Sequence, residues 1–322
     1  MASMALAEPV DLLEQAEVAE ALADRGQLAE AIAAYETARA AGAGSARVLN
    51  RLAGLYLQTD QLEKGAALLQ QSLREDSSQT QVCFELAKIF QVRDRPDSAL
   101  LYARRAHALE PKSSVIATLI GAVHLQAERP AEAKKAFARA LELDSQNPEA
   151  YRFLGVYYTE ADSLNEAIAQ FRQVVRIIPG DLEAHNNIAF LLARQGKHTE
   201  ALTAYKKAES LAGEPRLRQA VRANREAVEA VMAGKLRARY ILVDSQSRAG
   251  EVAAKLGAGE KFAELAVRFS KAPNAQDGGD TGFFAPGELM PEFEQAVLGL
   301  KVGQTSEPIT LPMGVVIIHR LN

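Results

Sequence analysis

A 34-residue period runs through the first two thirds of the sequence and constrains the fold more than any other feature. Six blocks of this length follow one another without insertion or deletion, beginning at Leu12, Ala46, Thr80, Ser114, Pro148 and Leu182. Self-similarity at such a period is typical of helical repeat proteins. The region is therefore predicted to be a repeat array.

Small residues recur at fixed places in each block and predict close contacts between helices. The eighth place, which follows a large aliphatic residue, holds Ala19, Ala53, Ala87, Gly121, Gly155 and Ala189. The twentieth holds Ala31, Gly65, Ala99, Ala133, Ala167 and Ala201, and the twenty-seventh Ala38, Ser72, Ala106, Ala140, Val174 and Ala208. The twenty-fourth is bulky in all blocks but the third: Tyr35, Leu69, Ala103, Phe137, Phe171 and Tyr205. Helices approach closely where small side chains meet, and a bulky neighbour fills the remaining space.

Helix-breaking residues divide each block into two helices. We expect Gly26, Asp60, Pro96, Pro130, Asp162 and Gly196 between the two helices of the successive hairpins. With these places in register, residues 12–215 resemble the tetratricopeptide repeat family. The resemblance implies a mainly α fold, a right-handed solenoid of six repeats with an extended concave surface.

Residues 216–235 are predicted to form a capping and linker helix, because a solenoid needs a polar end to stay in solution. Its apolar residues Leu217, Val221, Val228 and Val231 are expected to face the last hairpin, and Arg216, Arg218, Arg222 and Arg225 to face solvent. This basic face has two interpretations. It is a solvated surface, or it contacts an acidic partner.

In the tetratricopeptide family the first helix of each hairpin lines the concave surface. The resemblance places the following residues in a peptide groove: Asn50, Phe84, Lys88, Arg152, Val156, Asn186 and Phe190. Asn186 fits one position of the Lys and Asn clamp that some relatives use to bind a C-terminal carboxylate. Val156 and Phe190 do not fit that clamp, so the mixed surface favours an extended or helical polypeptide.

After Lys235 the period ends, and residues 236–322 show strand patterning at 238–243 and 314–321 with helical stretches between. Four motifs, at 262–270, 278–284, 292–300 and 303–309, resemble parvulin-type peptidyl-prolyl isomerases in order. The resemblance implies a small α+β domain with an apolar proline pocket. It places Phe293, Leu289, Thr281 and Met313 in that pocket.

The polar network of the parvulin family is largely absent from this sequence. The resemblance places its first-strand His on Tyr240, its Cys or Asp on Ala272, and its last-strand His on Val316. Its hydroxyl residues fall on Leu311 and Met313. Strand alternation predicts that His319 points to the opposite face from Val316. Tyr240 alone remains as a candidate catalytic group.

Three functional hypotheses follow. The first is a chaperone-like or scaffold protein that holds a polypeptide client in the groove and in a proline-preferring cleft with weak or no isomerase activity. The second is an active isomerase that recruits clients through its repeats. The third is a docking domain without a ligand.

Composition narrows the partners. The formal net charge of −4 and pI near 5.9 disfavour nucleic acid. One cysteine, Cys83 at a core position, and scattered histidines give no metal spacing and imply no cofactor. No apolar run is long enough to cross a membrane, and the oligomeric state stays open. The chain as written reads as cytoplasmic, although Ala5, Leu6 and Ala7 resemble the end of a signal sequence and leave a periplasmic location as the alternative.

Overall fold

The computed structural model describes residues 9–42 and 44–322, with side chains from residue 16 onward, so Ala5, Leu6 and Ala7 lie outside the described residues. The chain divides into two compact units, Met1–Pro179 and Gly180–Asn322. The sixth hairpin, the capping helix and the C-terminal domain all belong to the second unit.

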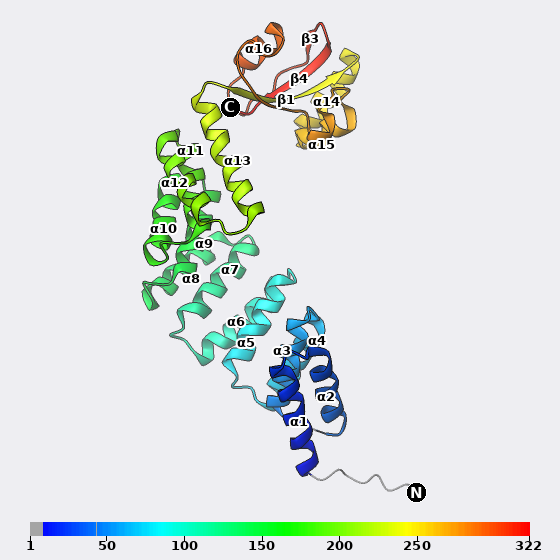
Figure 1. Ribbon diagram of the computed structural model, residues 1–322, viewed down its shortest axis with the longest axis vertical. Helices are drawn as coiled ribbons and strands as arrows, with labels where there is room; N and C mark the ends of the chain where they lie inside the picture. The colour runs from blue at the N-terminus through cyan, green and yellow to red at the C-terminus, as the bar shows by residue number, and fades with distance from the viewer. Residues whose placement is uncertain (1–8, 43) are drawn as a thin grey trace. The chain divides into compact units, whose positions relative to one another are not determined.

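Paired helices follow the predicted blocks (Figure 1). In the first unit they are α1 Pro9–Asp24, α2 Leu28–Ala40, α3 Ala46–Gln58, α4 Leu62–Glu75, α5 Thr80–Val92, α6 Pro96–Leu109, α7 Ser114–Gln126, α8 Pro130–Leu143, α9 Pro148–Glu160 and α10 Leu164–Ile177. The second unit continues with α11 Leu182–Arg194, α12 His198–Leu211 and α13 Pro215–Met232. Of the helices described, none has the length and apolar character that a membrane span requires.

Short polar side chains cap the N-terminus of the first helix in several hairpins. The Ser45 hydroxyl accepts a hydrogen bond from the Val48 amide, and Ser113 does the same for Ile116. Asn147 and Asp181 accept from the amides of Ala150 and Ala184 at 3.0 and 2.7 Å. Each satisfies one of the N–H groups that the first turn of a helix leaves unpaired. The start of these blocks is therefore fixed by N-terminal capping as well as by packing.

The turn inside each hairpin uses a residue with left-handed backbone. These residues are Gly26, Asp60, Asp94, Glu128, Asp162 and Gly196, with φ between 52° and 76°. They all occupy the fifteenth place of a block. Our expectation that Pro96 and Pro130 lie between the helices was wrong, because these prolines are the first residues of α6 and α8. Proline suits that place, since the first helical residue needs no amide hydrogen bond.

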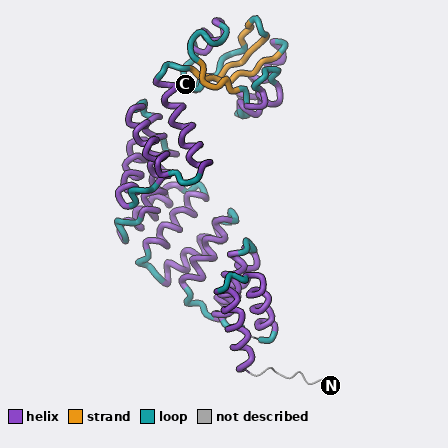
Figure 2. The backbone as a smooth tube through the Cα atoms, viewed as in Figure 1, coloured by secondary structure: helices purple, strands orange, loops and turns teal. Residues whose placement is uncertain are grey.

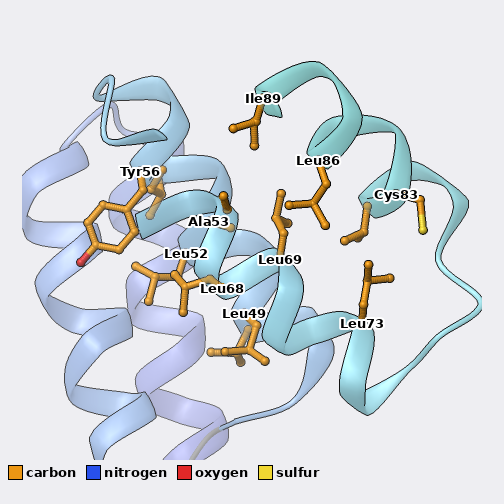
Figure 3. Packing of buried hydrophobic residues seen from close by; sticks show 14 of the residues in the cluster. Leu49, Leu52, Ala53, Tyr56, Leu68, Leu69, Leu73, Cys83, Leu86 and Ile89 are labelled. Carbon is orange, nitrogen blue, oxygen red and sulfur yellow. The ribbon is translucent and has the colours of Figure 1, made fainter. Parts of the chain in front are cut away.

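The predicted core places are buried. All residues at the twentieth, twenty-fourth and twenty-seventh places, from Ala31 to Ala208, are buried, and so is Cys83. Figure 3 shows how Leu69, Leu73, Leu86 and Cys83 meet between neighbouring helices. Val18 is an exception at the seventh place, since its side chain is 54% exposed. No repeat packs before the first one among the described residues, so Val18 lacks the neighbour that covers its counterparts.

Residue sizes at the eighth and twenty-fourth places are complementary. Where the twenty-fourth residue is Phe137 or Phe171, the eighth is Gly121 or Gly155. A Cβ atom on Gly121 would lie 2.4 Å from the Phe137 ring, and one on Gly155 would lie 2.7 Å from the Phe171 ring. The rings therefore occupy the space that an alanine methyl group takes in the other repeats.

Helix α13 caps the last hairpin, but its two faces differ from the prediction. Val221 and Val228 are buried as expected, whereas Leu217 is exposed. Arg225 does not face solvent; it forms ion pairs with Glu209 on α12 and Glu229 on its own helix. Leu217 is the third residue of α13, and its side chain is 44% exposed.

The C-terminal domain is a four-stranded sheet in the order β2-β1-β4-β3. Its elements are β1 Leu236–Val243, α14 Gln246–Gly257, α15 Phe262–Phe269, β2 Asp280–Phe284, α16 Pro291–Leu298, β3 Ile309–Leu311 and β4 Gly314–Arg320. All strand pairs are antiparallel, and β1 and β4 form the centre (Figure 2). The sequence indicated β1 and β4; the edge strand β2 was read as a glycine-rich turn.

Alternating residues of β1 and β4 face two separate cores. Ile241, Val315 and Ile317 pack with α14 and α15 on one face. Val316 and Ile318 pack with Phe293 and Val297 of α16 on the other. Figure 1 shows α16 on the opposite side of the sheet from α14 and α15. The period of two in side-chain direction thus assigns each strand residue to one face.

The Gly121 contact gives a test of the repeat packing. We expect Gly121→Ala to destabilise the protein, because overpacking costs about 1–3 kcal/mol, against a helix-propensity gain of about 1 kcal/mol. Urea unfolding followed by circular dichroism measures the effect. Gly54→Ala, in α3 with open space around its Cβ position, is the control and should stabilise by about 0.5–1 kcal/mol. Equal and stabilising effects of both substitutions would contradict the packing explanation.

Candidate peptide-binding sites

A cavity of about 300 Å³ opens on the α16 face of the C-terminal domain. It is lined by Tyr240, Pro273, Asn274, Asp280, Thr281, Leu289, Met290, Phe293 and Met313. The structure therefore brings together Tyr240 and the four residues predicted for the proline pocket. Pro273, Asn274, Asp280 and Met290 also line it and were not predicted. Asp280 directly follows the glycine pair 278–279, and its place beside this motif could have marked it as a candidate lining residue.

The cavity floor is aromatic. The rings of Tyr240 on β1 and Phe293 on α16 meet edge to face, with centroids 5.3 Å apart. Phe293 is buried and also belongs to the core of this face, so it has both a packing role and a surface towards the cavity. Leu289 and Met313, each 37% exposed, form the rim. Such an apolar hollow with few polar groups suits a ring of proline size or another small apolar side chain.

Three positions of the family's polar network are apolar and buried here, and a fourth, Met313, is apolar and exposed at the rim. Ala272, Leu311 and Val316 are each at most 9% exposed. Leu311 and Val316 pack in the same cluster as Phe293. Tyr240 is the polar exception, and burial raises the pKa of its phenol. Its hydroxyl is therefore protonated at neutral pH. Within the described part of the chain this hydroxyl makes no hydrogen bond.

His319 lies on the opposite face of the sheet, as strand alternation predicted. Its ring packs against Phe262, with centroids 5.6 Å apart, and its Nδ1 lies 2.9 Å from the Thr305 hydroxyl. Phe262 belongs to the core under α14 and α15. Burial and the nearby charge of Arg239 lower the pKa of His319. His319 does not rebuild the missing network beside Phe293.

The Thr281 hydroxyl closes a gap in the sheet. The pairing of β1 with β2 shifts register between Arg237 and Arg239. At this point the Thr281 hydroxyl accepts a hydrogen bond from the Ala238 amide and donates to the Ala238 carbonyl, both at 3.0 Å. Ala238 is fully buried, so its backbone groups need these partners. The hydroxyl is thus committed to the backbone, although Thr281 lines the cavity.

Asp280 is fixed at the cavity edge by an arginine. Arg237 donates to both of its carboxylate oxygens, at 2.9 and 2.6 Å. Burial alone would raise the pKa of Asp280, but the bonds from Arg237 and the Gly282 amide lower it overall. The carboxylate therefore stays ionised and paired, and it is poorly placed to act as a general base at neutral pH.

Sequence reasoning missed Glu294. This carboxylate follows Phe293 on α16, is buried, and accepts hydrogen bonds from the backbone of the loop that carries Leu289. A glutamate next to a core phenylalanine on a short amphipathic helix was the available signal, since buried carboxylates require partners.

A second cavity, of about 260 Å³, lies within the first unit between α5, α7 and α9. Its lining consists of Phe84, Lys88, Gln91, Val115, Thr118, Leu119, Ala122, Asn147, Glu149 and Phe153. The structure therefore brings together Phe84 and Lys88 of the predicted groove, with the Lys88 ammonium 5.7 Å from the Phe84 ring centroid. Phe153 and Glu149 were not predicted as groove residues.

The remaining groove candidates have other surroundings. The Asn50 amide donates to Gln79 at 2.6 Å, and Arg152 pairs with Glu149 at 3.3 Å. Val156 on α9 is half-buried. Asn186 and Phe190 lie on α11 in the second unit, where Phe190 is exposed beneath the guanidinium of Arg194. Their role as one peptide groove stays a prediction.

No cluster of three or more His, Cys, Asp or Glu side chains that could hold a metal ion occurs within residues 9–42 and 44–322.

Comparison with known families agrees with both parts of the chain. The PPIC-type PPIASE domain matches residues 242–322. Tetratricopeptide repeat families match residues 22–82, 118–181 and 182–215. The chain is a fusion of tetratricopeptide repeats with a parvulin-type domain.

Similar proteins include foldases and a chaperone. Foldase protein PrsA of Geobacillus kaustophilus is 47% identical over 85 residues, which cover 26% of this chain and 30% of that protein. Chaperone SurA of Cupriavidus pinatubonensis is 30% identical over 185 residues, which cover 57% of this chain and 35% of that protein. The match thus spans about a third of the length of these relatives.

Solved structures share the repeat fold. A tetratricopeptide repeat protein from Parabacteroides merdae has a TM-score of 0.58 at 15% identity, covering 68% of this chain and 90% of its own. Pseudomonas aeruginosa pilF has a TM-score of 0.53 at 17% identity, covering 66% and 97%. At these identities the likeness concerns the fold.

The role of Thr281 can be separated from that of the cavity. Thr281→Val keeps the shape but leaves two buried backbone groups of Ala238 unpaired, which should cost about 1–3 kcal/mol. Thermal unfolding of the intact chain measures this. Thr310→Val, on the exposed edge strand β3, should stay within about 0.5 kcal/mol. A Thr281→Val protein as stable as the wild type would show that the hydroxyl is dispensable.

Proposed function

We propose that this protein is a chaperone-like binding protein whose repeats hold a polypeptide client and whose parvulin-type domain adds a proline-preferring cleft with weak or no isomerase activity. The observation that carries the proposal is the α16-face cavity. It keeps an apolar hollow around Phe293, while the positions of the family's polar network hold Ala272, Leu311 and Val316.

The cleft is suited to binding more than to catalysis. Rotation about a peptide bond has a barrier of about 18–20 kcal/mol, and the family resemblance implies a polar network that helps to lower it. In this chain the titratable residues at the cavity are Tyr240, with a raised pKa, and Asp280, which is held by Arg237. Apolar contact with Leu289, Phe293 and Met313 remains available to a proline ring.

The repeat cavity supports the client-binding part of the proposal. Phe84, Val115 and Phe153 offer apolar surface, and Lys88 and Glu149 offer charges of both signs beside it. A polypeptide with alternating apolar and polar residues fits such a lining. The names of the foldase and chaperone relatives agree with this class of function. Two modest sites in one chain would also gain affinity for a client that reaches both.

An active isomerase is the second candidate, and one observation favours it. Tyr240 keeps a protonated hydroxyl at the cavity, next to Phe293. A protease-coupled assay on Leu-Pro peptides decides between the two. The proposal predicts a rate at or close to the uncatalysed one, whereas strong acceleration that Tyr240→Phe abolishes would establish the enzyme.

Binding in the cleft is tested with a labelled tetrapeptide that contains Leu-Pro and a counterpart that contains Leu-Ala. We expect the wild type to prefer the proline peptide. Leu289→Ala with Met313→Ala removes the rim and should weaken this binding about tenfold, since truncation loses apolar contact area. Fluorescence anisotropy measures both affinities.

Leu298→Ala is the matched control, because Leu298 is exposed on α16 but does not line the cavity. Its affinities should equal those of the wild type. If the wild type binds both peptides equally, the cleft has no preference for proline and this part of the proposal is wrong.

The groove hypothesis makes a separate prediction. Phe84→Ser and Phe190→Ser, made singly and together, should weaken capture of a permanently unfolded polypeptide such as reduced, carboxymethylated lactalbumin. Phe190 is exposed, and Phe84 is half-buried at the edge of the core, so helicity should be retained in circular dichroism. Val92→Ser, in α5 and strongly exposed outside the cavity, is the control. Capture that is unchanged in the double variant would place the client elsewhere.

A further inference from the structure

The loop of residues 285–290 supplies one wall of the α16-face cavity, and Met290 at its end packs against the core of this face. Residues 286–289 are exposed, and Leu289 itself is 37% exposed. Leu289 and Met290 nevertheless line the cavity. Side-chain burial therefore anchors the loop at Met290 but not at residues 286–289. Within the loop the Ala285 amide donates to the Glu288 carboxylate at 2.7 Å, and the loop must also be fixed to the rest of the domain.

The Glu294 carboxylate accepts hydrogen bonds from that backbone. The Gly287 amide donates to Oε1 and Oε2 at 3.0 and 2.9 Å, and the Leu289 amide donates to Oε1 at 2.9 Å. The donors come from the wall itself, and the acceptor comes from the helix that carries Phe293. Charge-assisted bonds of this kind are the stronger class of hydrogen bond.

The carboxylate is buried and ionised. Glu294 is 9% exposed, and the amides of Gly287 and Leu289 lower its pKa. A buried charge is tolerated where donors surround it, so the loop and the carboxylate satisfy each other. A glutamine has one oxygen and a donor NH2 group, and it cannot reproduce the same set of bonds.

We propose that Glu294 is a positioning residue that holds residues 285–290 against α16, so that Leu289 and Met290 form the wall of the cavity. The kind of ligand that contacts this wall rests on the proposed function, whereas the role of Glu294 in holding the loop does not. Glu294 acts through the loop and does not touch the ligand.

The test compares Glu294→Gln with Glu292→Gln in the intact chain. Glu292 lies on the same helix and is exposed, so its substitution removes the same charge without touching the loop. Amide hydrogen exchange by NMR should show Gly287 and Leu289 exchanging about tenfold or more faster in Glu294→Gln. Both amides should keep wild-type rates in Glu292→Gln.

The core of the domain provides the internal reference. Ile317 and Ile318 on β4 should keep their protection in both variants, which distinguishes local loosening from unfolding. If they too exchange faster, Glu294→Asp is used, because it keeps the charge but withdraws the oxygens by one methylene group. Unchanged exchange at Gly287 and Leu289 in a folded variant would overturn the proposal.

Peptide binding then separates the two proposals. Glu294→Gln should reduce the preference for the Leu-Pro over the Leu-Ala tetrapeptide, and Glu292→Gln should not. A loop that loosens while this preference is fully retained would overturn the positioning role. A wild type without any preference would instead sink the proline-binding function, and the exchange data alone would decide the role of Glu294.

Discussion

The central constraint on the C-terminal domain is the alternation of side chains along β1 and β4. Because successive residues point to opposite faces, Val316 and Ile318 share the face of Phe293, while Val315, Ile317 and His319 share that of Phe262. A histidine three places along the strand cannot replace one at Val316. The chemistry of the cavity is therefore decided by which residues occupy alternate places, and here those places are apolar.

The repeats depend on a different constraint, the volume available where two helices cross. The eighth and twenty-fourth places of a block share this volume, so a phenylalanine at one coincides with a glycine at the other. In the other blocks alanine at the eighth place stands with Tyr, Leu or Ala at the twenty-fourth, so glycine accompanies phenylalanine alone. The contact between the eighth and twenty-fourth places lies within one hairpin and does not involve the predicted groove residues.

Much of the architecture could be predicted from sequence, because packing acts at fixed spacing. The small residues from Ala31 to Ala208 lie in the core, and β1 and β4 lie where strand patterning placed them. Edge strand β2 was missed because it needs only one partner strand, contains Gly282 and directly follows Gly278 and Gly279, and glycines also suit turns. The left-handed turn residues Asp94 and Glu128 were missed because Pro96 and Pro130, two residues further on, are the stronger helix-breaking signals.

The site was predictable in part. The family resemblance assembled the residues that line the α16-face cavity, since ordered motifs bring their own spatial relations. The roles of Thr281 and Glu294 were not, because each depends on a backbone group far along the chain or in a loop of irregular shape. Local sequence patterns carry no information about such partners.

The charge state of the cavity depends little on pH near neutrality. Among its lining residues in the described structure, Tyr240 and Asp280 titrate, and their pKa values are displaced in opposite directions, upward for the phenol and downward for the carboxyl. A site built on histidine changes charge near neutrality. This cleft keeps a single charge state from mildly acidic to mildly alkaline surroundings, and its contact with an apolar ring is indifferent to acidity over that range.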